Sequence, residues 1–145
     1  MMIRVLIAQA VLVCAVIAVG CDSGIKRVPA AGTVTLDGQP LKEGVLLFSP
    51  DPSKGNNARV GCSGPISNGK FNLTTAGMSR ADNGPGAPVG WFKVTYSHPN
   101  EGSLKDGAAV PKVAPRYARE ETTPLLIELT DPPPAEGYKI ELQSK

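Results

Sequence analysis

The stretch Gly32-Thr33-Val34-Thr35-Leu36-Asp37-Gly38-Gln39-Pro40-Leu41 decides the fold of this 145-residue chain. Val34 and Leu36 alternate with threonines, which is the two-residue period of a β-strand with one buried face. Asp37-Gly38 follows directly, and glycine accepts the positive φ that a tight hairpin turn requires. The stretch therefore predicts a strand over about 28–36 and a turn that reverses the chain.

Six further segments have strand character, and each is bounded by turn residues. Asn68-Gly69 is a second hairpin dipeptide, and the apolar run 45–48 is typical of a strand buried on both faces. Long loops are predicted at 76–89 and 98–123. The predicted strands are 28–36, 45–48, 58–64, 70–75, 90–97, 125–129 and 138–142, with Val34, Leu36, Val60, Cys62, Phe71, Leu73, Phe92, Val94, Tyr96, Tyr138, Ile140 and Leu142 facing inward.

The composition excludes several classes of protein. Glycine and proline number 16 and 14, and after residue 20 no segment free of both is longer than eight residues. An average α-helix needs about 11–12 residues, so helical bundles are excluded. The formal net charge is only +2, without a charged run, which argues against a nucleic-acid partner. Length and composition together indicate one all-β domain.

The N-terminus predicts export. Arg4 precedes an apolar stretch over 5–19 that only Gln9 interrupts. This stretch is short for a membrane span and suits a signal peptide. It ends in Ala18-Val19-Gly20-Cys21, which resembles the bacterial lipobox, whose cysteine receives lipid before cleavage. We therefore predict a lipoprotein signal peptide at 1–20, a lipidated N-terminus and tether at 21–27, and a domain at 28–145. An ordinary secreted protein and an uncleaved anchor are the alternatives.

The three cysteines fit this interpretation. Cys14 would leave with the signal peptide, and Cys21 would be the site of lipid attachment. Cys62 would then have no intramolecular disulfide partner in the mature chain. No basic residue lies close to it in sequence, so we expect a small buried apolar side chain rather than a reactive thiol.

Four motifs resemble a known family. The stretch 32–41 has the form G-x-V-x-x-D-G-x-P-L, which opens carboxypeptidase regulatory-like domains. Residues 68–73 resemble the D-G-x-F-x-L hairpin of that family, with asparagine in place of aspartate, and residues 86–95 resemble its G-x-P-x-G-x-Y-K-V-x-V strand. A C-terminal segment is similar to that of small bacterial lipoproteins of this type, at 110–112, 115–117 and 122–125. The resemblance implies a seven-stranded, immunoglobulin-like or transthyretin-like (prealbumin-like) β-sandwich.

We expect no enzymatic activity, no metal and no cofactor. In the family that the motifs resemble, this sandwich is an accessory domain and not the catalytic one. The transthyretin-related hydroxyisourate hydrolases use several histidines, whereas this chain has one, His98, predicted to be a solvated loop residue. No zinc-ligand cluster, serine-hydrolase motif or calcium-loop spacing is present.

The sequence favours a structural or protein-interaction module that is held at the bacterial cell envelope. Its predicted contacts are the membrane, through lipid on Cys21, and an unknown envelope protein or glycan, with no nucleic acid. The predicted localisation is export and lipid anchoring to a bacterial membrane, on its periplasmic or outer face. A carbohydrate- or peptide-binding module is the first alternative, with Trp91 and Tyr117 as candidate contacts, because exposed aromatic rings stack on sugars and anchor peptides. A hydrolase of the transthyretin-related type is the second.

Overall fold

A computed structural model describes residues 24–99 and 110–145, so the predicted signal peptide and Cys21 lie outside the described residues. The described chain is all-β, and its helices are three short 3-10 turns. None of them is long and apolar enough to cross a bilayer. The strands are β1 (Ala31–Leu36), β2 (Gln39–Pro40), β3 (Glu43–Pro50), β4 (Gly61–Ser67), β5 (Lys70–Asn72), β6 (Thr74–Ala76), β7 (Gly84–Pro85), β8 (Gly90–Ser97), β9 (Leu126–Leu129) and β10 (Tyr138–Leu142), and the 3-10 helices are η1 (Pro52–Lys54), η2 (Arg80–Asp82) and η3 (Pro115–Ala118).

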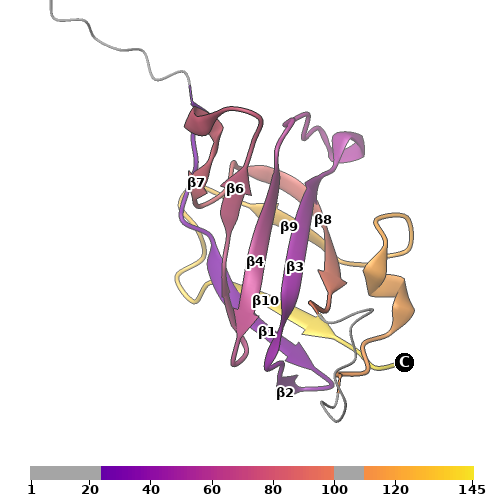
Figure 1. The fold of residues 1–145 in the computed structure, drawn as a ribbon. Helices are drawn as coiled ribbons and strands as arrows, with labels where there is room; N and C mark the ends of the chain where they lie inside the picture. The colour runs from indigo at the N-terminus through magenta and orange to yellow at the C-terminus, as the bar shows by residue number, and fades with distance from the viewer. Residues whose placement is uncertain (1–23, 100–109) are drawn as a thin grey trace, which may run out of the picture.

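The strands form one curled sheet. Its hydrogen-bonded order is β10-β1-β5-β4-β3-β8-β9, and all neighbours along this path are antiparallel except β1 and β10. Off this path, β2 pairs with β1, β6 pairs with β4, and β7 pairs with β6. Figure 1 shows β3, β4 and β6 on one side of the molecule and β1, β9 and β10 on the other. The curl therefore encloses a core between two parts of the same sheet.

Both predicted turn dipeptides make the turns that the sequence requires. Asp37 and Gly38 have φ values of 49° and 82°, and Asn68 and Gly69 have values of 49° and 76°. Two consecutive positive φ values are the signature of the type I′ turn, whose twist matches that of the flanking strands. The first turn joins β1 to β2, and the second joins β4 to β5.

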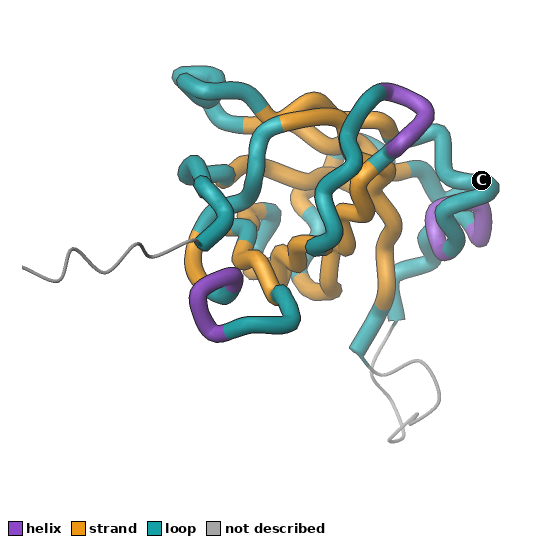
Figure 2. The backbone as a smooth tube through the Cα atoms, turned by 90° about the horizontal axis from the view of Figure 1, so that it is seen from above, coloured by secondary structure: helices purple, strands orange, loops and turns teal. Residues whose placement is uncertain are grey.

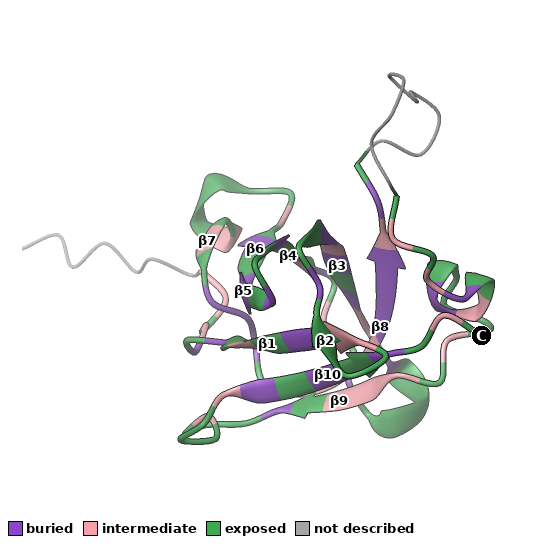
Figure 3. Cartoon of the chain, turned by 90° about the horizontal axis from the view of Figure 1, so that it is seen from below, coloured by how far each residue is buried: buried purple, intermediate pink, exposed green. Residues whose placement is uncertain are grey.

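The predicted inward-facing residues lie in or beside the core, together with others outside that set, such as Leu46 and Phe48. Nearly all of them are under 8% exposed, Leu36 being half-buried, and Figure 3 shows the buried segments alternating with exposed ones along the strands. Phe48 lies at the centre, with its ring centroid 6.1 Å from that of Phe71 and 6.2 Å from that of Phe92. These separations fall within the favourable range for aromatic pairs. The alternation thus brings one apolar face of each strand into a common interior.

The prediction for 45–48 was wrong in one respect. This segment lies in β3, which has β4 and β8 as neighbours, but only one of its faces is covered. Leu46 and Phe48 are buried, whereas Leu47 is 42% exposed on the opposite face. The outward-facing Leu47 lies beside the small residues Gly61 and Ser63 of β4, which leave much of its side chain uncovered.

The predicted strand 70–75 is divided in two. Leu73 leaves the ladder between β5 and β6, and its backbone N–H donates to the carbonyl of Ala30 at 2.8 Å. Its own carbonyl accepts from the N–H of Gly86 at 2.8 Å. One residue therefore joins the N-terminal segment and the chain that leaves β7. The predicted loop 76–89 contains η2 and β7, and the described part of 98–123 contains η3.

The long strands give the molecule two distinct ends. We call the end where Gly24 enters the entry end, and it also carries η1 and η2 (Figure 1). Figure 2 views the molecule from this side. The opposite end, which we call the far end, carries the turns at Asp37 and Asn68. Strand β3 runs from the far end to the entry end, and β8 returns antiparallel to it.

Candidate functional site

The far end carries a candidate site, built on the segment between β2 and β3. Leu41 donates its backbone N–H to the carbonyl of Val34 at 3.1 Å, and its carbonyl accepts from Gly69 at 2.7 Å. The carbonyl of Lys42 accepts from the N–H of Asn68 at 2.9 Å. Both type I′ turns therefore hold this segment, because the second turn bonds to the chain that follows the first.

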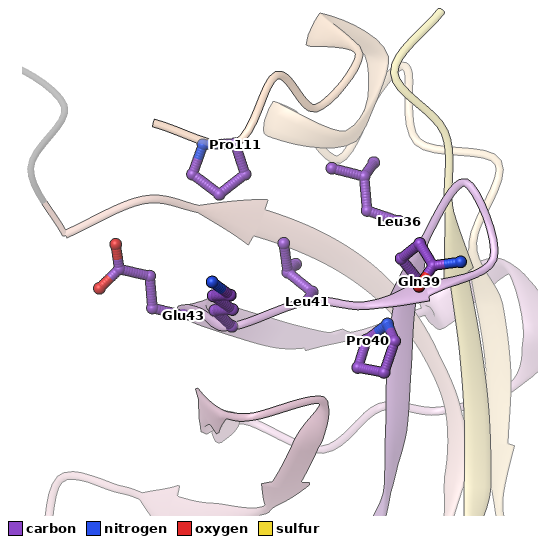
Figure 4. Close-up of a pocket in the computed structure, with 7 residues that line it drawn as sticks. Leu36, Gln39, Pro40, Leu41, Glu43 and Pro111 are labelled. Atoms are coloured by element: carbon purple, nitrogen blue, oxygen red, sulfur yellow. The ribbon is translucent and has the colours of Figure 1, made fainter. Parts of the chain in front are cut away.

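A small apolar hollow opens over this segment. Its volume is about 210 Å3, and Figure 4 shows Pro111 facing Leu41, with Gln39 towards one end and Glu43 towards the other. Leu41 itself is 3% exposed and forms the base. The charged groups at the rim are those of Lys42 and Glu43. The lining residues are Leu36, Gln39, Pro40, Leu41, Lys42, Glu43 and Pro111.

A second hollow lies beside the first and shares Pro111 with it. Its volume is about 170 Å3, and it is lined by Tyr96, His98, Val110, Pro111, Val113, Ala114, Pro115 and Ala118. Nε2 of His98 lies 3.3 Å from Oε1 of Glu43, so an imidazole–carboxylate pair links the two hollows. Both volumes lie below the roughly 300–1,000 Å3 that is typical of small-molecule sites. Hollows of this size suit single apolar side chains of a partner.

The structure corrects the prediction that His98 is a solvated loop residue. Its side chain is only 3% exposed, and that of Glu43 is 53% exposed. The sequence held a signal for this burial, because His98 continues the two-residue period of Phe92, Val94 and Tyr96 beyond the end of β8. The lining residues of the two hollows include no serine, threonine or cysteine that could act with this imidazole. The chemistry that the arrangement offers is recognition of an apolar group next to a carboxylate.

Trp91 lies at the entry end, where the structure fixes it by its backbone. Its carbonyl accepts from the N–H of Asp51 and from Nδ2 of Asn56, both at 2.9 Å. Nζ of Lys54 lies 5.8 Å from the centroid of the indole ring, within cation–π range. The side chain is half-buried, so part of the ring is open to a partner. Its role as a contact stays a prediction.

Tyr117 is placed differently from the expectation. It is 3% exposed and packs in the core from η3. The guanidinium of Arg116 lies 4.9 Å from the ring centroid and donates to Oε1 of Gln143 at 2.6 Å. A stacking contact with a ligand needs an open ring face, so this placement gives no support to Tyr117 as a contact residue. The hydrogen bond from Arg116 to Gln143 instead connects η3 to the C-terminal segment.

Cys62 is buried in the core, as expected. Its Sγ lies 3.5 Å from Oγ1 of Thr75, whose hydroxyl donates to the carbonyl of Gly86 at 2.7 Å. Burial raises the pKa of the Cys62 thiol, and the contact with Thr75 only partly offsets this. The thiolate is the reactive form of cysteine, so a raised pKa makes the group inert.

Metal ligation and similarity to known proteins add nothing to this site. Within residues 24–99 and 110–145, no group of three or more histidine, cysteine or acidic side chains is arranged to hold a metal ion. No family model, curated protein or solved structure matches the chain. The candidate site therefore rests on the geometry of the far end alone, while Cys21 lies outside the described residues and stays a prediction.

Proposed function

We propose that the chain is an exported, lipid-anchored and non-enzymatic domain that presents an interaction surface at a bacterial cell envelope. The observation that carries this proposal is the lipobox-like end of the apolar segment, Ala18-Val19-Gly20-Cys21. The first described residue, Gly24, follows only three positions later, and the chain reaches the core at Val28. A lipid on Cys21 would thus hold a folded domain close to the membrane.

We also infer that the curled sheet is a seven-stranded, transthyretin-like sandwich. Each of the seven predicted strands overlaps a strand of the structure, although β4 begins and ends three residues later than predicted, and seven strands make up the hydrogen-bonded path. The turn at Asp37-Gly38 and the turn at Asn68-Gly69 occupy the positions that the carboxypeptidase regulatory-like pattern assigns to turns. These features support a common architecture, and fold alone does not define a function.

The far end supports a protein partner best. Its two hollows are small and mostly apolar, and the half-exposed carboxylate of Glu43 lies between them. A peptide segment with one apolar side chain beside a basic one would satisfy both features. The half-buried ring of Trp91 favours the second candidate, a carbohydrate contact, because sugars stack on open aromatic faces. The hydrolase alternative has less support, because the imidazole of His98 is 3% exposed.

The intact mass of the protein extracted from membranes tests the anchor. We expect a mature chain that begins at Cys21 and carries acyl mass. Cys21→Ala should lose this mass, because one thiol holds all the lipid added before cleavage. Cys62→Ala is the matched control and should keep the acyl mass, since the Cys62 thiol is buried and takes no part in anchoring. A soluble wild-type product without acyl mass would contradict the proposal.

A further inference from the structure

Another hollow lies at the entry end, separate from the two hollows at the far end. Its volume is about 430 Å3, and it is lined by Ile25, Ala58, Arg59, Val60, Met78 and Asp82. The side chain of Met78 is fully exposed, at 103% of its reference area. Ile25 lies on the segment by which the chain enters the domain, so the entering chain forms part of this surface. Together with Ile25, Ala58 and Val60, Met78 gives the hollow an apolar lining, and a continuous apolar patch of this kind is a candidate surface for a partner.

Arginines surround these apolar groups. Arg59 lines the hollow, Arg80 is exposed in η2, and Nη1 of Arg27 donates to the carbonyl of Ala81 in η2 at 3.0 Å. One carboxylate, that of Asp82, lies among them and accepts from the hydroxyl of Ser79 at 2.7 Å. Lys26 lies between Ile25 and Arg27 and is paired with a second carboxylate, that of Asp131, at 3.0 Å. The apolar side chains of Ile25 and Met78 therefore lie within a mainly positive rim.

The length of the tether limits what can meet this surface. Three residue steps separate Cys21 from Gly24, and an extended chain covers about 3.5 Å per residue, so Gly24 stays within about 11 Å of Cys21. Ile25 follows Gly24 directly. If Cys21 carries lipid in a bilayer, the hollow at the entry end is the part of the domain that the bilayer surface reaches first.

We propose that the entry end docks on the surface of the anionic bilayer that holds the lipid of Cys21. Met78 and Ile25 enter the interfacial layer, and Arg27, Arg59 and Arg80 pair with lipid phosphates. This inference rests on the proposed anchor and adds an orientation to it. The domain does not swing freely on its tether but stands with the far end, and the hollows beside Glu43, directed away from the membrane.

The single tryptophan reports on this orientation, because Trp91 lies at the entry end. The probe is the acylated, full-length mature protein in vesicles of phosphatidylethanolamine and phosphatidylglycerol that carry a headgroup-nitroxide lipid. Nitroxide groups quench indole fluorescence at short range, so docking should quench Trp91. Quenching should fall at high salt and in vesicles of phosphatidylcholine, because both weaken attraction between the arginines and the surface.

Two double variants with the same change of charge separate the ends. Arg59→Gln/Arg80→Gln removes two charges from the entry end, and Lys42→Gln/Lys112→Gln removes two from the far end. Each basic group near an anionic surface favours the bound state about fivefold, so the first variant should lower the docked-to-free ratio about 25-fold. The second variant should leave the quenching of Trp91 unchanged. Met78→Ser should also reduce quenching, since it removes the apolar group that enters the interface.

The outcomes distinguish this inference from the proposed anchor. Normal acyl mass with equal quenching in wild type and Arg59→Gln/Arg80→Gln would overturn docking and leave the anchor in place. An equal loss of Trp91 quenching in both double variants would also overturn docking, because the membrane would then attract both ends of the domain equally. A wild-type protein without acyl mass would overturn the anchor, and the orientation would fall with it. Circular dichroism of each variant verifies that the fold is kept.

Discussion

The far end and the entry end of this domain are built by opposite means. At the far end, two type I′ turns bond to one short segment and bury Leu41 beneath it. At the entry end, two 3-10 helices and the entering chain leave Met78 wholly in solvent. Most of the far-end hollow comes from residues 36–43, which the two turns hold in place, and Pro111 joins them from a distant segment. The entry-end hollow is formed by residues from three distant segments. The difference teaches that the two ends of one sheet can be assembled in different ways.

Removing a large apolar side chain from each end should give the largest contrast. Leu41→Ala should lower the free energy of unfolding by about 2–5 kcal/mol, because it leaves a cavity under the far-end hollow. Met78→Ala should change it by less than about 0.5 kcal/mol, because Met78 is fully exposed. Urea denaturation measures both values. Similar losses in the two variants would show that the ends do not differ in packing.

A pair of glycines gives a smaller contrast. Gly69 and Gly55 have nearly the same φ, 76° and 83°, but an added Cβ at Gly69 would lie 2.7 Å from Cβ of Pro40, and one at Gly55 would meet nothing within 4 Å. Gly55→Ala should therefore lower the free energy of unfolding by about 1 kcal/mol, because alanine disfavours the left-handed conformation. Gly69→Ala should lower it by about 2–3 kcal/mol, because a steric clash is added to that effect. Thermal denaturation of both variants measures the difference, and equal costs would disprove the tight approach at the far end.

The smallest contrast concerns two carboxylates, one at each end. The hydroxyl and amide of Ser53 donate to Oδ1 of Asp51 at 2.6 and 3.0 Å, and they lower the pKa of Asp51. Hydrogen bonds from Ser144 likewise lower the pKa of Asp37. Each bond stabilises the fold above the ordinary aspartate pKa of about 3.9 and loses its effect as the pH falls through the lowered value.

Ser53→Ala should therefore raise the pKa of Asp51 towards its ordinary value and leave that of Asp37 unchanged. Ser144→Ala should raise only the pKa of Asp37. The two carboxyl groups can be followed by carbon NMR during an acid titration. A shift of both groups in either variant would mean that the ends are coupled through the sheet.

Local patterns in the sequence predict much of this fold. Alternation identifies the buried faces of β8 and β10, and the dipeptides at Asp37 and Asn68 identify the turns, because each signal depends only on neighbouring residues. The open face of β3 could not be predicted, since the exposure of Leu47 depends on what other segments leave uncovered. The burial of His98 could have been predicted, because His98 continues the two-residue alternation of Phe92, Val94 and Tyr96 beyond the end of β8.

The candidate site was much less predictable than the fold. The far-end hollow needs Leu41, Glu43 and Pro111 to meet, and nothing in their spacing indicates that they do. Trp91 was predicted as a contact because of its residue type, whereas the hydrogen bond from Asn56 to its backbone carbonyl could not be predicted. Such sites are assembled by tertiary packing, so single-sequence patterns contain no direct record of them.

The parallel pairing of β1 with β10 also has a consequence for the order of folding. Gly32 pairs with Tyr138 and Leu36 with Leu142, and the amide of Ser144 donates to Asp37 across 107 residues of sequence. The first strand to be synthesised therefore lacks one neighbour until the last strand has followed it. Contacts of such long range slow folding and expose unpaired edges in the meantime. A chain exported from its N-terminus would complete this domain only after its final residues have crossed the membrane.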